Sequence, residues 1–151
     1  MHRIGRALAL VAALVPASVA LGEIHITGAW VRAMPPTQSM TAGYMALHNR
    51  GQESVSITGA SSDVSPRVEI HTTVERDGMQ RMQPLDALEL RAGERIELAP
   101  GGHHLMLRDM PEMPSLGDAV ELCLTIKGAD PVCASAAVAS AIPEADSHNP
   151  H

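Results

Sequence analysis

Two histidines and two methionines stand in a pattern that suits a soft metal ion. They are His71, Met82, His104 and Met106, spaced His-x10-Met-x21-His-x-Met, and are called the His2Met2 set below. Imidazole and thioether are soft, uncharged ligands that favour Cu(I), whereas Ca²⁺ and Mg²⁺ prefer oxygen. Zinc usually recruits cysteine or carboxylate, so this pattern predicts a Cu(I) site.

Two short strands are expected to position these side chains. Asp77-Gly78 is a strong signal for a two-residue hairpin turn. The register of that hairpin places Met82 diagonally across from His71 on one face, about 7–8 Å away. His104 and Met106 are two residues apart on another strand and also share a face. The four ligands converge if the fold brings these two elements together.

The rest of the chain has the pattern of β-structure. Short alternating or β-branched runs are separated by Gly, Pro, Asp and Asn, which predicts an all-β antiparallel sandwich or barrel. The expected strands are 23–31, 42–49, 54–60, 68–74, 79–85, 95–99, 104–108, 119–126 and 132–140. The sequence shows no internal repeat and no linker, so we expect one domain over residues 21–141. A flexible polar tail is expected over 142–151.

Residues 1–20 have the layout of a secretory signal peptide. Arg3 and Arg6 precede an uncharged apolar run, and small residues follow up to Ala20. The run is shorter than the about 20 apolar residues that span a bilayer, although a retained anchor is the alternative. We therefore expect a periplasmic mature protein without stable membrane insertion.

Charge and motifs argue against several classes of function. The formal net charge is −6 and no basic stretch follows the leader, which argues against nucleic-acid binding. No nucleophile–base pair or paired carboxylates have a suggestive spacing, and four ligands leave no open position for a substrate. The sequence therefore indicates a binding protein and no enzyme.

The two cysteines, Cys123 and Cys133, lie in the last expected hairpin. They are nearly opposite if the turn centres near Gly128, and the periplasm permits disulfides. A structural disulfide is the first prediction; free thiols that bind copper or exchange disulfides are the alternative. The spacing gives little support to a thioredoxin-like activity, and the thiolate motif of a blue-copper electron-transfer site is missing.

Further methionines and histidines have open roles. Met79 lies three residues before Met82 and is a competing ligand. Four more methionines lie in Pro-rich loops: Met34, Met40, Met110 and Met113. They either form a rim around the copper, with Met110 as a secondary contact, or pack the loops. His148 and His151 either add a weak Cu(II) site or are solvated.

The His2Met2 spacing resembles the signature of the PCuAC family, periplasmic copper chaperones linked to cytochrome c oxidase assembly. Four further segments agree with that family: AWVRA at 29–33, YMALHN at 44–49, VEIHT at 68–72 and PGGHHLML at 100–107. The likeness runs from residue 23 to about residue 139. It implies a cupredoxin-like β-sandwich that binds Cu(I) near its surface.

The resemblance also implies a function. It describes a monomeric copper chaperone that passes Cu(I) to a partner, such as the copper subunit of the oxidase or a Sco-like thiol protein. Periplasmic copper sequestration or resistance without a dedicated acceptor is the alternative. A storage protein is expected to bind several ions and to need no acceptor.

Overall fold

The computed structural model describes residues 24–143, and every regular element in this range is a β-strand. The strands are β1 (Ile24–Arg32), β2 (Thr41–Asn49), β3 (Val55–Ser62), β4 (Arg67–Arg76), β5 (Met79–Pro84), β6 (Leu88–Leu90), β7 (Arg95–Leu98), β8 (His104–Arg108), β9 (Ala119–Ile126) and β10 (Val132–Ala139). The all-β prediction is confirmed. Only β6 was not predicted, because its three residues are too few to show an alternating pattern.

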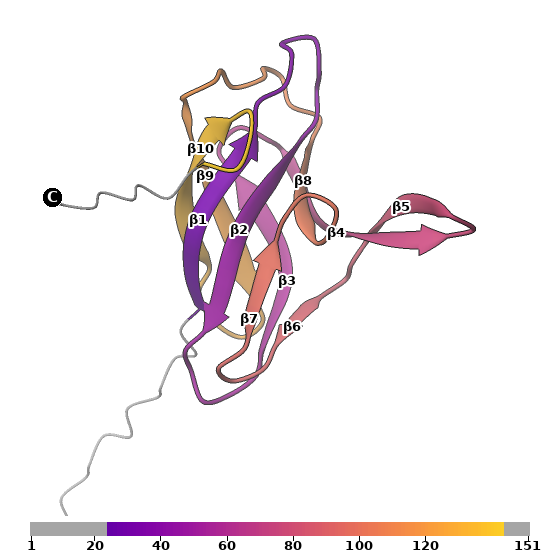
Figure 1. The fold of residues 1–151 in the computed structure, drawn as a ribbon. Coiled ribbons are helices and arrows are strands. Elements are labelled where there is room, and N and C mark those ends of the chain that lie inside the picture. Colours follow the sequence, from indigo (N-terminus) through magenta and orange to yellow (C-terminus); the bar gives the residue numbers. More distant parts are fainter. Residues whose placement is uncertain (1–23, 144–151) are drawn as a thin grey trace, which may run out of the picture.

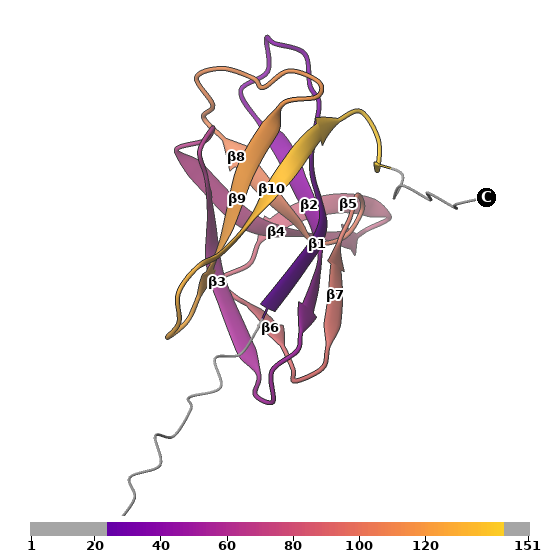
Figure 2. The same cartoon turned by 90° about the vertical axis from the view of Figure 1, so that its left-hand side faces the viewer.

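The strands form one mixed sheet that closes on itself. Its order is β5-β4-β8-β2-β1-β10-β9-β3-β6, with β7 beside β2, and a pairing of β3 with β4 closes the ring. Figures 1 and 2 show the resulting flattened, sandwich-like body. Of the pairings between two of these strands, only that of β1 with β10 is parallel, and the others are antiparallel. These strands come from opposite ends of the domain, so no hairpin imposes an antiparallel direction on them.

Alternation along β8 separates the core from the outer face. Leu105 and Leu107 are fully buried in the hydrophobic core, so the residues between and before them, His104 and Met106, face outward. Gly43 on the neighbouring β2 lies close to this core, where a Cβ atom would approach Leu122 to 3.1 Å. Packing inside the ring therefore directs two of the predicted ligands to the outside.

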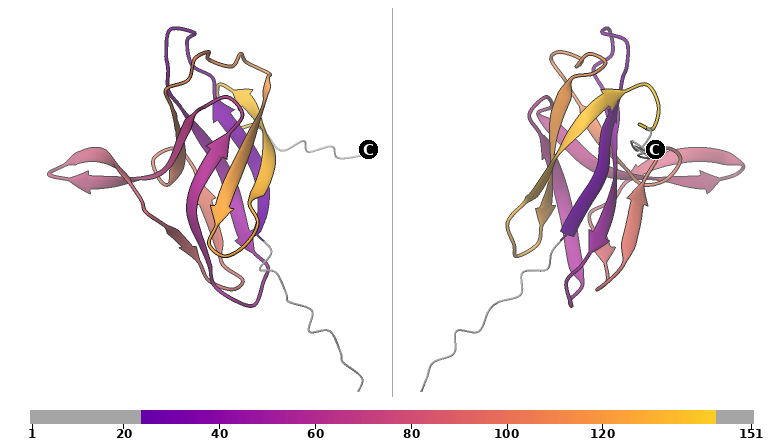
Figure 3. Two further views of the ribbon diagram at one scale, coloured as in Figure 1. Left: turned by 180° about the vertical axis from the view of Figure 1, so that it is seen from behind. Right: turned by 60° about the vertical axis from the view of Figure 1, so that its left-hand side comes forward.

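The β4–β5 hairpin projects from the body. β4 pairs with β8 only over Arg67–His71, and its second half pairs with β5 alone, so the hairpin extends away from the ring (Figures 1 and 3). Asp77 and Gly78 have φ angles of 54° and 72°, as a tight type I′ turn requires. The observed pairing of Thr73 with Met82 is the register that the sequence predicted.

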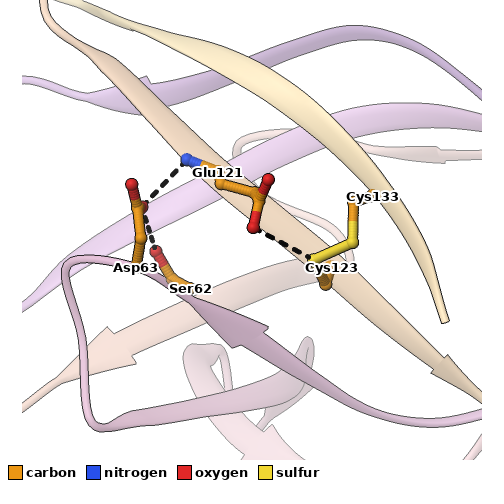
Figure 4. The surroundings of a disulfide bond; sticks show 5 residues. All are labelled: Ser62, Asp63, Glu121, Cys123 and Cys133. Atoms are coloured by element: carbon orange, nitrogen blue, oxygen red, sulfur yellow. Dashed lines mark hydrogen bonds between the residues drawn. A yellow bond between two sulfur atoms is a disulfide. The ribbon is translucent and has the colours of Figure 1, made fainter.

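The two cysteines form the predicted disulfide. Cys123 on β9 and Cys133 on β10 are direct cross-strand partners with Cα atoms 4.0 Å apart, and their sulfurs are bonded (Figure 4). The carboxylate of Glu121 lies 3.8 Å from the Cys123 sulfur. Because both sulfurs are in the disulfide, this group offers no thiolate ligand.

The ends of the chain bear on two further predictions. The expected signal peptide, residues 1–20, and most of the expected tail, residues 144–151, lie outside the residues that the structure describes. Within residues 24–143, no helix has the length and apolarity needed to cross a membrane.

Breaking the disulfide is expected to lower stability. Its closed loop has a sequence separation of 10, for which the chain-entropy model gives about 2–3 kcal/mol of free energy of unfolding. Denaturant titrations of the oxidised and reduced protein measure this difference. Equal midpoints would contradict this expectation. Intact-mass analysis shows independently whether the purified protein is two hydrogens lighter than its dithiol form.

Candidate metal centre

The register between β4 and β8 places two of the predicted ligands directly opposite each other. His71 pairs with His104 across these antiparallel strands, and their ring centroids are 5.8 Å apart with an interplanar angle of 49°. The two residues are only 8% and 3% exposed. Two imidazoles at this separation can reach one ion between them.

Each ring has one nitrogen held by hydrogen bonding and one without a partner. His104 donates from Nδ1 to the carbonyl oxygen of Gly102 at 3.0 Å, and His71 donates from Nε2 to Oε2 of Glu69 at 2.8 Å. The remaining nitrogens, Nε2 of His104 and Nδ1 of His71, are buried and have no hydrogen-bond partner. Such atoms are costly to bury, and this arrangement is typical of metal-ligating histidines.

An ionised carboxylate orients His71. Glu69 lies two residues earlier on β4, and its oxygens also contact Arg67 Nε at 3.2 Å and Arg108 Nη1 at 3.4 Å. The hydrogen bond with His71 lowers the pKa of Glu69, and the two arginines add to this effect against the opposing effect of burial. A carboxylate can only accept here, so the neutral His71 ring carries its proton on Nε2 and its lone pair on Nδ1.

Burial favours the neutral form of His104. Desolvation lowers its pKa, the hydrogen bond to Gly102 opposes this, and the charges of His71 and His103 lower it further. Only neutral imidazole offers a lone pair to a metal ion, so the low-dielectric surroundings keep His104 ready to bind.

The two methionines of the His2Met2 set lie beside the histidine pair. Met106 follows His104 by two residues on the outer face of β8, opposite Ala42 of β2. Met82 is 61% exposed on the projecting hairpin. Both line one groove of about 350 Å³. All four predicted ligands therefore share one outer face, with buried imidazoles and more accessible thioethers.

The other methionines divide into two groups. Met34 and Met40 line the same groove, as a rim would require. Met110 and Met113 are 5% and 7% exposed and belong to the hydrophobic core, so they pack the fold. Met79 is 55% exposed next to the hairpin turn and does not line the groove.

Glu69 was missed in the sequence although a signal for it was present. Its position two residues before His71 places both side chains on one face of a strand. A metal-bound histidine commonly donates its second ring proton to a carboxylate, so an acidic residue at that spacing was a candidate partner. The pairing of β4 with β8, which brings in Arg108, is a long-range contact that local pattern does not encode.

Comparison with known proteins connects this geometry to a family. The model of the family described as "Putative lipoprotein LpqE-like" matches residues 24–138. A "Putative lipoprotein" of Leifsonia xyli subsp. xyli is 30% identical over 102 residues, 67% of this chain and 60% of the relative. An uncharacterized protein of Rickettsia prowazekii is 30% identical over 113 residues, 72% of this chain and 61% of the relative. The chain thus spans about three fifths of the length of each relative.

Solved structures give the same fold. The copper-bound PCuAC domain from PmoF2 is 29% identical, with a TM-score of 0.67, and the match covers 81% of this chain and 97% of that domain. The Cu(I) form of DR1885 from Deinococcus radiodurans is 26% identical, with a TM-score of 0.63, covering 84% and 85%. The predicted resemblance to PCuAC domains and the cupredoxin-like architecture are confirmed.

Removing the Glu69 carboxylate is expected to weaken metal binding. Loss of a partner that orients a ligand typically costs about 10–100-fold in metal affinity, which we expect for Glu69→Ala. Competition titration of Cu(I) against a chelator measures the effect. Glu75→Ala is the matched control, because Glu75 lies on the same strand four residues after His71, opposite Gln80. Equal affinities of the two variants would contradict the role of Glu69.

The lowered pKa of His104 predicts a pH dependence of the metal-free protein. The folded-state pKa of His104 lies below the ordinary value of 6.5. Between these two pKa values the folded protein therefore binds fewer protons than the unfolded chain. The free energy of unfolding should therefore fall as the pH drops from the unfolded-state pKa through the folded-state pKa. An NMR titration of the His104 ring checks this directly, and a pKa at or above 6.5 would contradict the prediction.

Proposed function

Because the chain belongs to the LpqE-like family and has the fold of PCuAC domains, we propose that it is an extracytoplasmic copper chaperone. In this proposal the His2Met2 set binds one Cu(I) ion as cargo, and the protein passes that ion to an acceptor. The chain performs ligand exchange and no bond-making catalysis. The family and the Leifsonia relative are both described as putative lipoproteins, which supports a location outside the cytoplasm.

The observation that carries this proposal is the pair of unpartnered ring nitrogens. Nδ1 of His71 and Nε2 of His104 are buried without hydrogen bonds on facing strands, while the opposite nitrogen of each ring is engaged. Leaving two buried acceptors unsatisfied costs on the order of 1–3 kcal/mol each. A metal ion between the rings would recover this cost.

The chemistry of the set supports Cu(I) as the cargo. Four neutral donors leave the site with the single positive charge of the ion, and thioethers bind soft ions well. A divalent ion would bring twice the charge into a half-buried site whose direct ligands include no anion. The copper-bound state of the PmoF2 domain and the Cu(I) state of DR1885 give independent support.

The exposure of the ligands suggests an order of release. Met82 is 61% exposed on the projecting hairpin, whereas His104 is 3% exposed at the base of the site. An acceptor that approaches from solvent meets the Met82 thioether first and can replace it. Displacement then proceeds inward to the histidines, so the ion is never without ligands during transfer.

The acceptor in this proposal is a stronger copper site on another protein. Its chemistry is that of thiolates or mixed Cys and His ligands, as in the oxidase copper subunit or a Sco-like thiol protein. Thiolates carry negative charge, which the His2Met2 set lacks, so the affinity gradient runs toward them. Copper sequestration without an acceptor is the second candidate, and transfer kinetics separate the two.

Conservative replacement of the thioethers tests the ligand set. Met82→Leu and Met106→Leu keep size and apolarity, so the fold should survive while the Cu(I) affinity falls by at least about tenfold, or 1.4 kcal/mol. Zn²⁺ at equal concentration should not displace Cu(I) from the unaltered protein. A Cu(I) titration of Met79→Leu distinguishes the two hairpin methionines, because a loss of Cu(I) affinity equal to that of Met82→Leu would make Met79 the ligand. Displacement by zinc would contradict the soft-ligand argument.

Transfer to a protein acceptor tests delivery against storage. We expect a metal-free dithiolate acceptor to remove Cu(I) faster than a small chelator of equal affinity, because only the protein can dock beside Met82. Stopped-flow mixing measures both rates at matched free-copper affinity. Binding of several Cu(I) ions of similar affinity, with acceptor and chelator equally slow, would favour storage.

A further inference from the structure

We propose that Met34 and Met40 hold a second, weaker Cu(I) position through which the ion leaves the His2Met2 set. This inference rests on the proposed function, because it concerns the path of the same cargo. The position lies in the groove of about 350 Å³ that Met82 and Met106 also line, here called the methionine groove. Neither Met34 nor Met40 is a member of the predicted ligand set.

The methionine groove collects thioethers from separate parts of the chain. Met34 follows β1 and Met40 precedes β2, whereas the ligands Met82 and Met106 come from β5 and β8. The remaining lining residues offer no second soft donor, so sulfur is the donor that suits Cu(I); they are Arg32, Thr41, Ala42, Tyr44, Pro100 and Gly101. An ion that exchanges one thioether for the next remains with soft ligands throughout.

The loop that carries Met34 and Met40 is tied at its base. The hydroxyl of Thr41 donates to the carbonyl oxygen of Arg32 at 2.6 Å, which joins the two ends of the loop. The amide of Met110 donates to the carbonyl oxygen of Ser39 at 3.0 Å and anchors the loop on the core. Both methionines therefore flank a restrained loop base and stay beside the groove.

Packing alone does not explain these thioethers. Met34 packs partly against the core, but Met40 is 45% exposed, and Met40 and Met82 are among the exposed large hydrophobic side chains of residues 24–143. Met110 and Met113, from the loop between β8 and β9, show the contrasting case of methionines that belong to the core. Two of the three exposed methionines of residues 24–143, Met40 and Met82, thus line one groove, and the third, Met79, lies outside it.

The groove is suited to brief occupancy. Arg32 also lines it, with its guanidinium carbon 5.8 Å from the centre of the Tyr44 ring. That positive charge disfavours a resting cation, and neutral thioethers offer no charge to compensate. The His2Met2 set combines two thioethers of the groove with two imidazoles, which the position at Met34 and Met40 lacks. The ion therefore rests at the His2Met2 set and occupies the second position only in passing.

Methionine methyl NMR tests the position directly. The protein is labelled with 13C at its methionine methyl groups and titrated with Cu(I) under anaerobic conditions. We expect the first equivalent to shift the Met82 and Met106 signals, and further Cu(I) to shift those of Met34 and Met40. Met79 is the reference, because it is 55% exposed and lies outside the groove.

The outcomes separate this inference from the proposed function. If Met34 and Met40 shift no more than Met79 while Met82 and Met106 respond, the exit position is wrong and the chaperone site stands. If Met82 and Met106 do not respond to the first equivalent, the proposed site fails as well.

A double variant supplies the kinetic test. Met34→Leu combined with Met40→Leu keeps the apolar lining and removes both sulfurs, so release of Cu(I) to a chelator should slow by roughly threefold to tenfold. Met79→Leu removes an exposed thioether outside the groove and is the comparison variant. Equal release rates for the two variants would overturn the proposal.

Discussion

The pairing of β4 with β8 is the constraint on which the rest of the site depends. Its register sets His71 opposite His104, and alternation along both strands turns Ile70, Leu105 and Leu107 into the core. A slip by one residue would exchange the two faces, burying Met106 and exposing leucine. The energy that holds the ligands in place is thus the burial of the side chains between them.

Electrostatics then decide which ion such a face can hold. The proposed ligands are neutral, and the Glu69 carboxylate, which contacts His71, is paired with Arg67 and Arg108. It orients His71, and the two guanidinium groups offset its negative charge. A singly charged soft ion fits this balance, and its release needs no titration of an anionic ligand. This combination suits a carrier, which must bind its cargo and also give it up.

Short sequence patterns predicted those features of the structure that join residues close together in the chain. Asp77-Gly78 was enough to place Met82 in its observed register, and the spacing of Cys123 and Cys133 predicted their bond. The β4–β8 and β1–β10 pairings join distant segments, so they emerged only from the fold. The roles of the loop methionines could not be separated in sequence, because their burial depends on those same long-range contacts.

The measurement that most directly tests the central claim is X-ray absorption spectroscopy of the protein loaded with one equivalent of Cu(I). The account predicts a first shell of two sulfur and two nitrogen scatterers, and an edge typical of the monovalent ion. Met106→Leu should reduce the sulfur contribution to one scatterer. A first shell without sulfur, or one unchanged by Met106→Leu, would contradict the assignment of copper to the face that β4 and β8 create.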